Sequence, residues 1–376
     1  MNQIHTPWIE IIPPRDRIDL AGPGFSDYQW QALFACQIGV PKHNDWVNLR
    51  WGFNAAALFD EAMKRQDLFL TSRHGINNEL RIENPNRQTL TFRYIHLPSE
   101  DLLLTMLGKV YARSKENAEK SALAYYCELK AAFPYDYALS AADSRDEFCR
   151  LSGWELLAQD EDRLNIAQIR RCETPIQLNQ KSPFLQGFWH SNAHAHEQIW
   201  RLMAALPGPV LMNTLLRSTV IYDNELQFLT KNATEIADLQ FPSLNPKALK
   251  TYKEWSENFA NRRQDPWQKF FYLQIHLVST REIDENIIRN VGACLTMNSS
   301  GQSLPGYQVK FPVPEERREW GTRIRNLDIV FSGSYLPAPR LSEVADMDEV
   351  LSAIRIPYSP PGDGFLDANF SSIKVE

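Results

Sequence analysis

Three of the eight histidines, His190, His194 and His196, lie within seven residues of one another. Imidazoles spaced by two or four residues can share one metal ion, and Glu197 could add a carboxylate oxygen. The segment lacks the second histidine of a His-Glu-x-x-His motif, and no cysteine lies nearby. Two interpretations stay open: a weak metal site, and a polar loop that caps a helix beginning at His196.

Arginines form a second group of side chains that could do chemistry. They come in adjacent pairs at the ends of expected elements: Arg170 and Arg171, Arg262 and Arg263, Arg317 and Arg318. A guanidinium favours bidentate contact with phosphate, so the pairs could form a nucleic-acid-binding rim. The alternative is a solvated surface or salt bridges between subunits.

Other catalytic chemistry finds no support in the residues. The sequence contains no Gly-x-x-x-x-Gly-Lys-Ser/Thr, so it lacks the backbone nest that cradles nucleotide phosphates. It also contains no Gly-x-Ser-x-Gly, and no cysteine stands in a recognisable nucleophile context. We therefore expect no catalytic residue, no cofactor and no ATP hydrolysis by this chain alone.

Charge and cysteine content limit the compartment and the partners. A net charge of −6 argues against a chain that binds nucleic acid over its whole surface, because phosphate affinity comes mainly from Lys and Arg. The five cysteines are scattered without a Cys-x-x-Cys pair, which favours a reducing compartment. No basic, apolar leader and no run of ~18 apolar residues occurs. We expect a cytoplasmic protein with no membrane contact.

The elements that must position these groups alternate between strand and helix in the second half of the chain. Two such units are expected at strand 166–171, helix 196–206 and strand 209–217, and at strand 270–279, helix 283–295 and strand 307–313. Helices at 223–239 and 246–264 lie between them. The pattern predicts an α/β (α+β) fold with ferredoxin-like split βαβ subdomains and helical insertions.

The first half has a less regular pattern. Apolar residues at three- and four-residue spacing favour helices over 28–38 and 99–133, the latter with a polar break at 113–117, and 68–72 favours a strand. We expect four parts: an N-terminal arm (1–45), an α+β domain (46–160), a ferredoxin-like domain (161–335), and a C-terminal helix and strap (336–376).

The stretch 345–370 carries a short acidic helix that the Ile356-Pro357 step ends. A Pro- and Gly-rich strap follows. Apolar side chains on such a strap are costly to leave in water, so we expect it to bind a protein partner. The expected partner-binding residues are Ile354, Arg355, Ile356, Tyr358, Phe365, Leu366 and Phe370.

In sequence, this acidic helix with its Arg-x-Pro step resembles the junction before the nucleotide-binding core of HerA/FtsK-type DNA-pumping ATPases, including conjugative-transfer ATPases. Further similar stretches are Ala132-Phe-Pro-Tyr-Asp-Tyr137, Ile169-Arg-Arg171, Phe188-Trp189 and Leu216-Arg-Ser-Thr219. The resemblance covers roughly residues 90–370 and implies the non-catalytic half of such an ATPase, with subdomains that pack in a ring. Because the Walker A motif is absent, no catalytic residue of that family has a counterpart here.

The resemblance implies an oligomeric accessory or scaffold subunit that works with a separately encoded ATPase in a DNA-transfer or antiphage defence assembly. Nucleic acid would then be met through the assembly. Two alternatives remain: an enzyme with an unrecognised, His-ligated metal site, and an independent nucleic-acid-binding protein.

Overall fold

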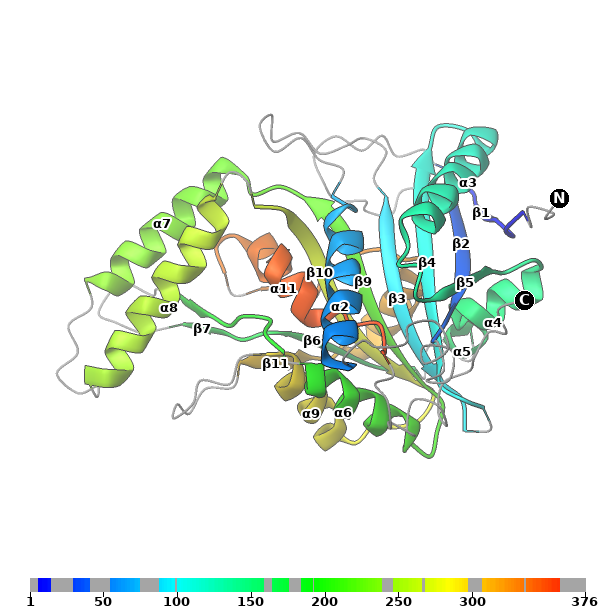
Figure 1. Ribbon diagram of the computed structural model, residues 1–376. Helices are drawn as coiled ribbons and strands as arrows, with labels where there is room; N and C mark the ends of the chain where they lie inside the picture. Colours follow the sequence, from blue (N-terminus) through cyan, green and yellow to red (C-terminus); the bar gives the residue numbers. More distant parts are fainter. Residues whose placement is uncertain are drawn as a thin grey trace.

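One antiparallel sheet of ten strands runs through the middle of the computed structural model (Figure 1). Along its main path the strand order is β1-β2-β4-β3-β9-β10-β6-β11, with β5 added beside β2 and β12 beside β10. The structure describes residues 6–14, 30–40, 55–74, 88–98, 100–158, 164–175, 184–191, 193–238, 246–265, 268–296, 306–334 and 336–358.

The strands of the sheet are β1 (Glu10–Ile12), β2 (Trp30–Gly39), β3 (Thr89–His96), β4 (Leu103–Ala112), β5 (Ala138–Ala141), β6 (Asn165–Arg171), β9 (Val210–Thr219), β10 (Phe270–Ser279), β11 (Tyr307–Lys310) and β12 (Val344–Asp346). A separate hairpin pairs β7 (Glu173–Pro175) with β8 (Phe184–Gln186). The α-helices are α2 (Ala55–Thr71), α3 (Lys115–Ala132), α4 (Arg145–Ser152), α5 (Trp154–Ala158), α6 (Ala193–Ala204), α7 (Asp223–Ala237), α8 (Pro246–Gln264), α9 (Glu285–Leu295), α10 (Arg317–Arg325) and α11 (Met347–Ala353). The α/β fold class is therefore confirmed.

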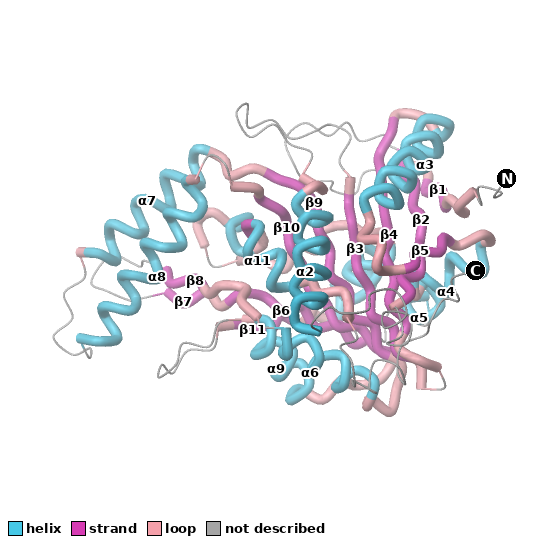
Figure 2. Tube along the Cα trace, viewed as in Figure 1, coloured by secondary structure: helices cyan, strands magenta, loops and turns pink. Residues whose placement is uncertain are grey.

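Helices cover both faces of the sheet (Figure 2). On one face the strand side chains share a core with α2, α3, α6, α9 and α11. On the other face, apolar strand residues pack against α4, α5 and α10. Burial on both sides explains why every residue of β10 is buried and why its sequence, Phe-Phe-Tyr-Leu-Gln-Ile-His-Leu-Val-Ser, is apolar almost throughout.

The two halves of the chain share one strand order. In the first half, the neighbours β5-β2-β4-β3 are the fourth, first, third and second strands in sequence; in the second half, β11-β6-β10-β9 repeat that order. A helix separates the first strand from the second, and the third from the fourth, in each half. The halves meet where β3 pairs with β9, so the sheet continues across the predicted boundary near residue 160. The ferredoxin-like subdomains and the domain limits stay predictions.

The helical insertion lies between β9 and β10. There, α7 and α8 form a long antiparallel pair that projects from one side of the sheet (Figure 1). The first half has only the short connection 97–102 at the equivalent place. Among the described helices, none combines the length and the apolar character needed to cross a membrane.

Three predictions of secondary structure are wrong. Residues 28–38 and the first part of 99–133 were expected as helices, but 30–38 lie in β2 and 103–112 form β4; residues 68–72 were expected as a strand, but 68–71 are the end of α2. In β4 every residue from Leu103 to Tyr111 is buried, so apolar side chains at helical spacing also fit a strand that is covered on both faces. Gly108 is suited to this strand, because a Cβ there would lie 2.1 Å from Phe34 Cζ.

Candidate functional site

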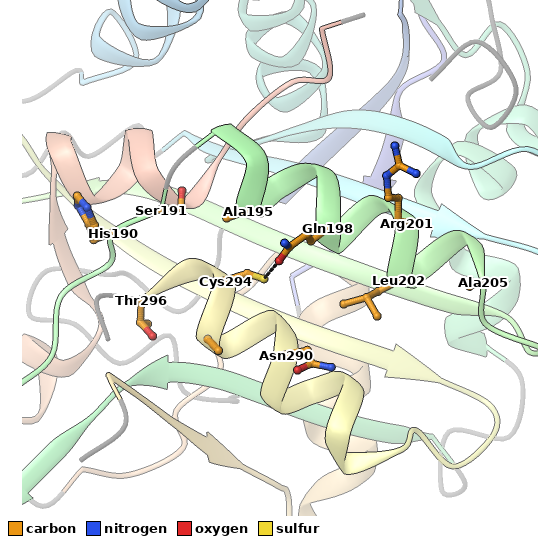
Figure 3. A pocket seen from close by; sticks show the side chains of 11 residues that line it. His190, Ser191, Ala195, Gln198, Arg201, Leu202, Ala205, Asn290, Cys294 and Thr296 are labelled. Atoms are coloured by element: carbon orange, nitrogen blue, oxygen red, sulfur yellow. Dashed lines mark hydrogen bonds between the residues drawn. The ribbon is translucent and has the colours of Figure 1, made fainter. Parts of the chain in front are cut away.

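A groove of about 790 Å³ lies between α6 and α9 (Figure 3). Its lining comes from the two helices and from the segments next to them: His190, Ser191, Ala195, Gln198, Arg201, Leu202, Ala205, Asn290, Ala293, Cys294 and Thr296. Figure 3 shows Gln198 on α6 facing Cys294 on α9 across the groove.

Local packing fixes both walls of the groove. On α6, Ile199, Trp200 and Met203 are buried in the core beneath, which leaves Gln198 and Arg201 exposed. On α9, Gly292 lets the helix approach β11, since a Cβ at that position would meet the Tyr307 ring at 2.5 Å. Asp284 begins α9 by accepting a hydrogen bond from the Asn286 amide.

Three polar side chains that line the groove have partners within the fold. The Cys294 thiol donates to Gln198 Oε1 at 3.4 Å, and burial raises the pKa of this thiol, which disfavours the nucleophilic thiolate. Arg201 forms an ion pair with Glu197 at 2.7 Å on the same helix. The Thr296 hydroxyl donates to the Gly292 carbonyl at 2.8 Å. The Cys294 thiol is therefore a hydrogen-bond donor in this groove rather than a nucleophile.

The three candidate metal ligands do not have a common environment. His190 is exposed at the groove, whereas His196 is 2% exposed and donates through Nε2 to the Ser352 carbonyl at 2.8 Å. Burial lowers the pKa of His196 to about 4. The side chain of His194 lies outside the described residues. Within the described part of the chain, no group of three or more His, Cys, Asp or Glu side chains could hold a metal ion. His196 is therefore a structural residue, and the prediction that it binds a metal ion is wrong.

The predicted arginine rim is also corrected. Arg170, Arg171 and Arg263 are buried, at 1–2% exposure. Arg171 and Arg263 both pair with Glu349 of α11, at 2.8 and 2.7 Å. Burial alone would raise the pKa of this carboxyl, but the arginines around it lower the pKa below its ordinary value. These guanidiniums hold α11 to the core and are not available to phosphate.

The remaining arginines of the predicted rim have other partners or surroundings. Arg170 pairs with Glu173 and Glu343, both at 3.1 Å. The half-buried Arg262 contacts Asp346 and Asp348. On α10, Arg317 is half-buried and Arg318 is exposed.

The C-terminal strap folds back onto its own chain as far as the structure describes it. Ile354, Ile356 and Tyr358 are 3–5% exposed. The Gln66 amide of α2 brackets the backbone of Ile356, accepting from its N–H at 3.0 Å and donating to its carbonyl at 2.9 Å. Arg355 pairs with Asp67 at 3.0 Å. The predicted partner contacts of residues 354–358 are thus replaced by internal packing, and Phe365, Leu366 and Phe370 lie outside the described residues.

The sequence analysis missed the polar residues of the groove, above all Gln198 and Asn290. Their signal is weak, because an exposed amide on an amphipathic helix is ordinary until a second helix is known to lie beside it. In comparisons with known proteins, no protein-family model and no curated protein matches the chain.

Proposed function

We propose that this chain is a non-catalytic scaffold subunit that binds a partner protein through the α6–α9 groove. The observation that carries the proposal is the lining of the groove. It presents the amides of Gln198 and Asn290 on two packed helices, its Arg201 is paired with Glu197, and its thiol is held in the protonated form. Amides such as Gln198 and Asn290 can each donate and accept, which suits the backbone groups of a polypeptide segment.

We further propose that the partner is a separately encoded ATPase of HerA/FtsK type in a DNA-transfer or antiphage defence assembly. The resemblance of the sequence to the non-catalytic half of such ATPases supports this choice. The use of the buried arginines inside the fold supports a scaffold rather than an independent nucleic-acid-binding protein.

The test is coexpression with a separately encoded HerA/FtsK-type ATPase, followed by measurement of the affinity between the two proteins. Ala293→Trp places an indole in the groove, and Ala131→Trp on the exposed face of α3 is the matched control. We expect Ala293→Trp to weaken binding at least tenfold, about 1.4 kcal/mol, with the control unchanged. Equal affinity of both variants would refute the groove as the interface, and ATP turnover by the isolated chain would refute the scaffold function.

A further inference from the structure

Arg217 lies near the end of β9 and is a buried cation without a carboxylate partner in the described part of the chain. It is 8% exposed, and its guanidinium lies 4.8 Å from the centre of the Tyr272 ring on β10. The Nε atom is sealed from solvent and has no hydrogen-bond acceptor. Burying a charge is costly unless an opposite charge or several acceptors face it. We therefore expect a negatively charged hydrogen-bond acceptor beside the Arg217 guanidinium.

The residue opposite Arg217 in the sheet also lacks a partner. Thr89 on β3 pairs with Arg217 in register, so both side chains point to the same face of the sheet. Thr89 is 1% exposed, and its hydroxyl has no hydrogen-bond partner in the described structure. The Cβ atoms of such cross-strand neighbours lie about 4.5–5.5 Å apart. Two polar side chains without a hydrogen-bond partner among the described residues, at Arg217 Nε and the Thr89 hydroxyl, thus lie on neighbouring strands and on the same face of the sheet.

The two cations near Arg217 are each neutralised by a carboxylate, whereas, among the described residues, Arg217 is not. Lys109 on β4, opposite Thr89, forms an ion pair with Asp328. On the far side, Arg340 lies 5.1 Å from the centre of the Tyr272 ring and pairs with Glu225 at 3.1 Å. Each of these cations has its own carboxylate.

The central strands around Arg217 carry no negative charge, and Asp346 of β12 is paired with Arg262 and Arg263. The strands β2, β3, β4, β6, β9, β10 and β11 contain no Asp or Glu. Lys109 and Arg340 thus each have a carboxylate partner, whereas Arg217 has none in the described structure.

We propose that Arg217 and Thr89 form a binding site for a small oxyanion of the phosphate or sulfate type. The guanidinium offers two parallel N–H donors to two oxygens of such an ion, and the hydroxyl of Thr89 donates to a third. The low exposure selects for a compact ion over a polymer. The site is independent of the α6–α9 groove and adds an anion-binding function to the proposed scaffold.

The test measures binding of inorganic phosphate to the full chain by calorimetry and by thermal melting, at constant ionic strength with chloride as the reference anion. We expect phosphate to raise the melting temperature of the wild type. In Arg217→Met this shift should disappear, and in Thr89→Val the affinity should fall several-fold. Arg289→Met, an exposed arginine paired with Glu285 on α9, is the control and should bind as the wild type does.

If Arg217→Met does not fold, Arg217→Lys decides the question, because it keeps the charge but loses the bidentate geometry; we expect at least tenfold weaker binding. A wild type that phosphate does not stabilise beyond chloride would overturn the proposal. A phosphate shift that persists in both Arg217 variants would also overturn it.

Discussion

At the scale of single residues, two buried histidines differ in their hydrogen bonds. His196 donates to the Ser352 carbonyl, whereas neither ring nitrogen of His276 has a partner in the described structure. We expect His196→Leu to lower the free energy of unfolding by about 1–3 kcal/mol, because it leaves a buried acceptor unsatisfied. His276→Leu should be neutral or stabilising. Urea denaturation of both variants above pH ~7, where free histidine is neutral, makes the comparison.

The same pair predicts a pH dependence. Burial lowers the pKa of His196 to about 4, and burial together with Arg93 lowers the pKa of His276 to about 3. The unfolded chain binds these protons near pH ~6.5, so each histidine favours unfolding as the pH falls below that value and down to its folded pKa. His276→Leu should flatten the loss of stability between these limits. An unchanged pH profile in this variant would contradict the buried, neutral state of His276.

The sequence alone could have shown that Arg170 and Arg171 do not act together. Arg170 and Arg171 are consecutive in a strand that the sequence predicts, and consecutive strand residues point to opposite faces. They could not have formed one phosphate-binding patch, and in the structure Arg170 meets Glu343 while Arg171 meets Glu349. Glu343 and Glu349 lie more than 170 residues away in sequence, so no local pattern could identify them as partners.

At the scale of elements, predictions succeeded where local signals were strong. The strand at 270–279 and the helix at 246–264 were predicted with the observed limits, the strand because it is rich in large apolar residues. The predictions failed at β2 and β4, where burial on both faces removes the alternation that marks a strand. Such a strand can be distinguished from a buried helix only when the strands and helices that pack around it are known.

The strap leads to a prediction about truncation, the removal of residues 355–376. Ile356 and Tyr358 are buried against this chain. Each such side chain contributes about 1.5–3 kcal/mol when buried, so we expect this truncation to lower the unfolding free energy by several kcal/mol. Removal of 359–376 is the matched control, since it keeps every described contact of the strap. Equal urea midpoints for the two truncated chains would refute the stabilising role.

At the scale of the whole molecule, the arrangement of the second half was predicted better than that of the first. The order strand–helix–strand, helical insertion, strand–helix–strand was expected and is present between β6 and β11. The repeated order in the first half went unseen because β2 and β4 were interpreted as helices. The pairing of β3 with β9 joins residues more than a hundred positions apart, and such a contact leaves no local trace in one sequence.

The pairing of β3 with β9, which we call the seam between the two halves, leads to a prediction about cooperative unfolding. β3 and β9 pair in register from Thr89↔Arg217 to His96↔Val210. Between these two strands, Arg93 donates a hydrogen bond to Asn213 Oδ1 at 2.8 Å. One apolar core also includes strands of both halves. Because unfolding either half would expose the edge and core of the other, we expect a single calorimetric transition and equal opening free energies for amides of β2 and β10 in native-state hydrogen exchange.

Met212, 1% exposed on β9 and opposite Tyr94 of β3, is the residue with which to test the seam. Met212→Asp buries a carboxylate in the shared core and should lower the stability of both halves together, by about 3 kcal/mol or more. Leu123→Asp on α3, where the leucine is 38% exposed, is the control and should change little. If Met212→Asp lowered the protection of β9 and β10 but left β2 unchanged, the two halves would be independent domains, divided as the sequence predicts near residue 160.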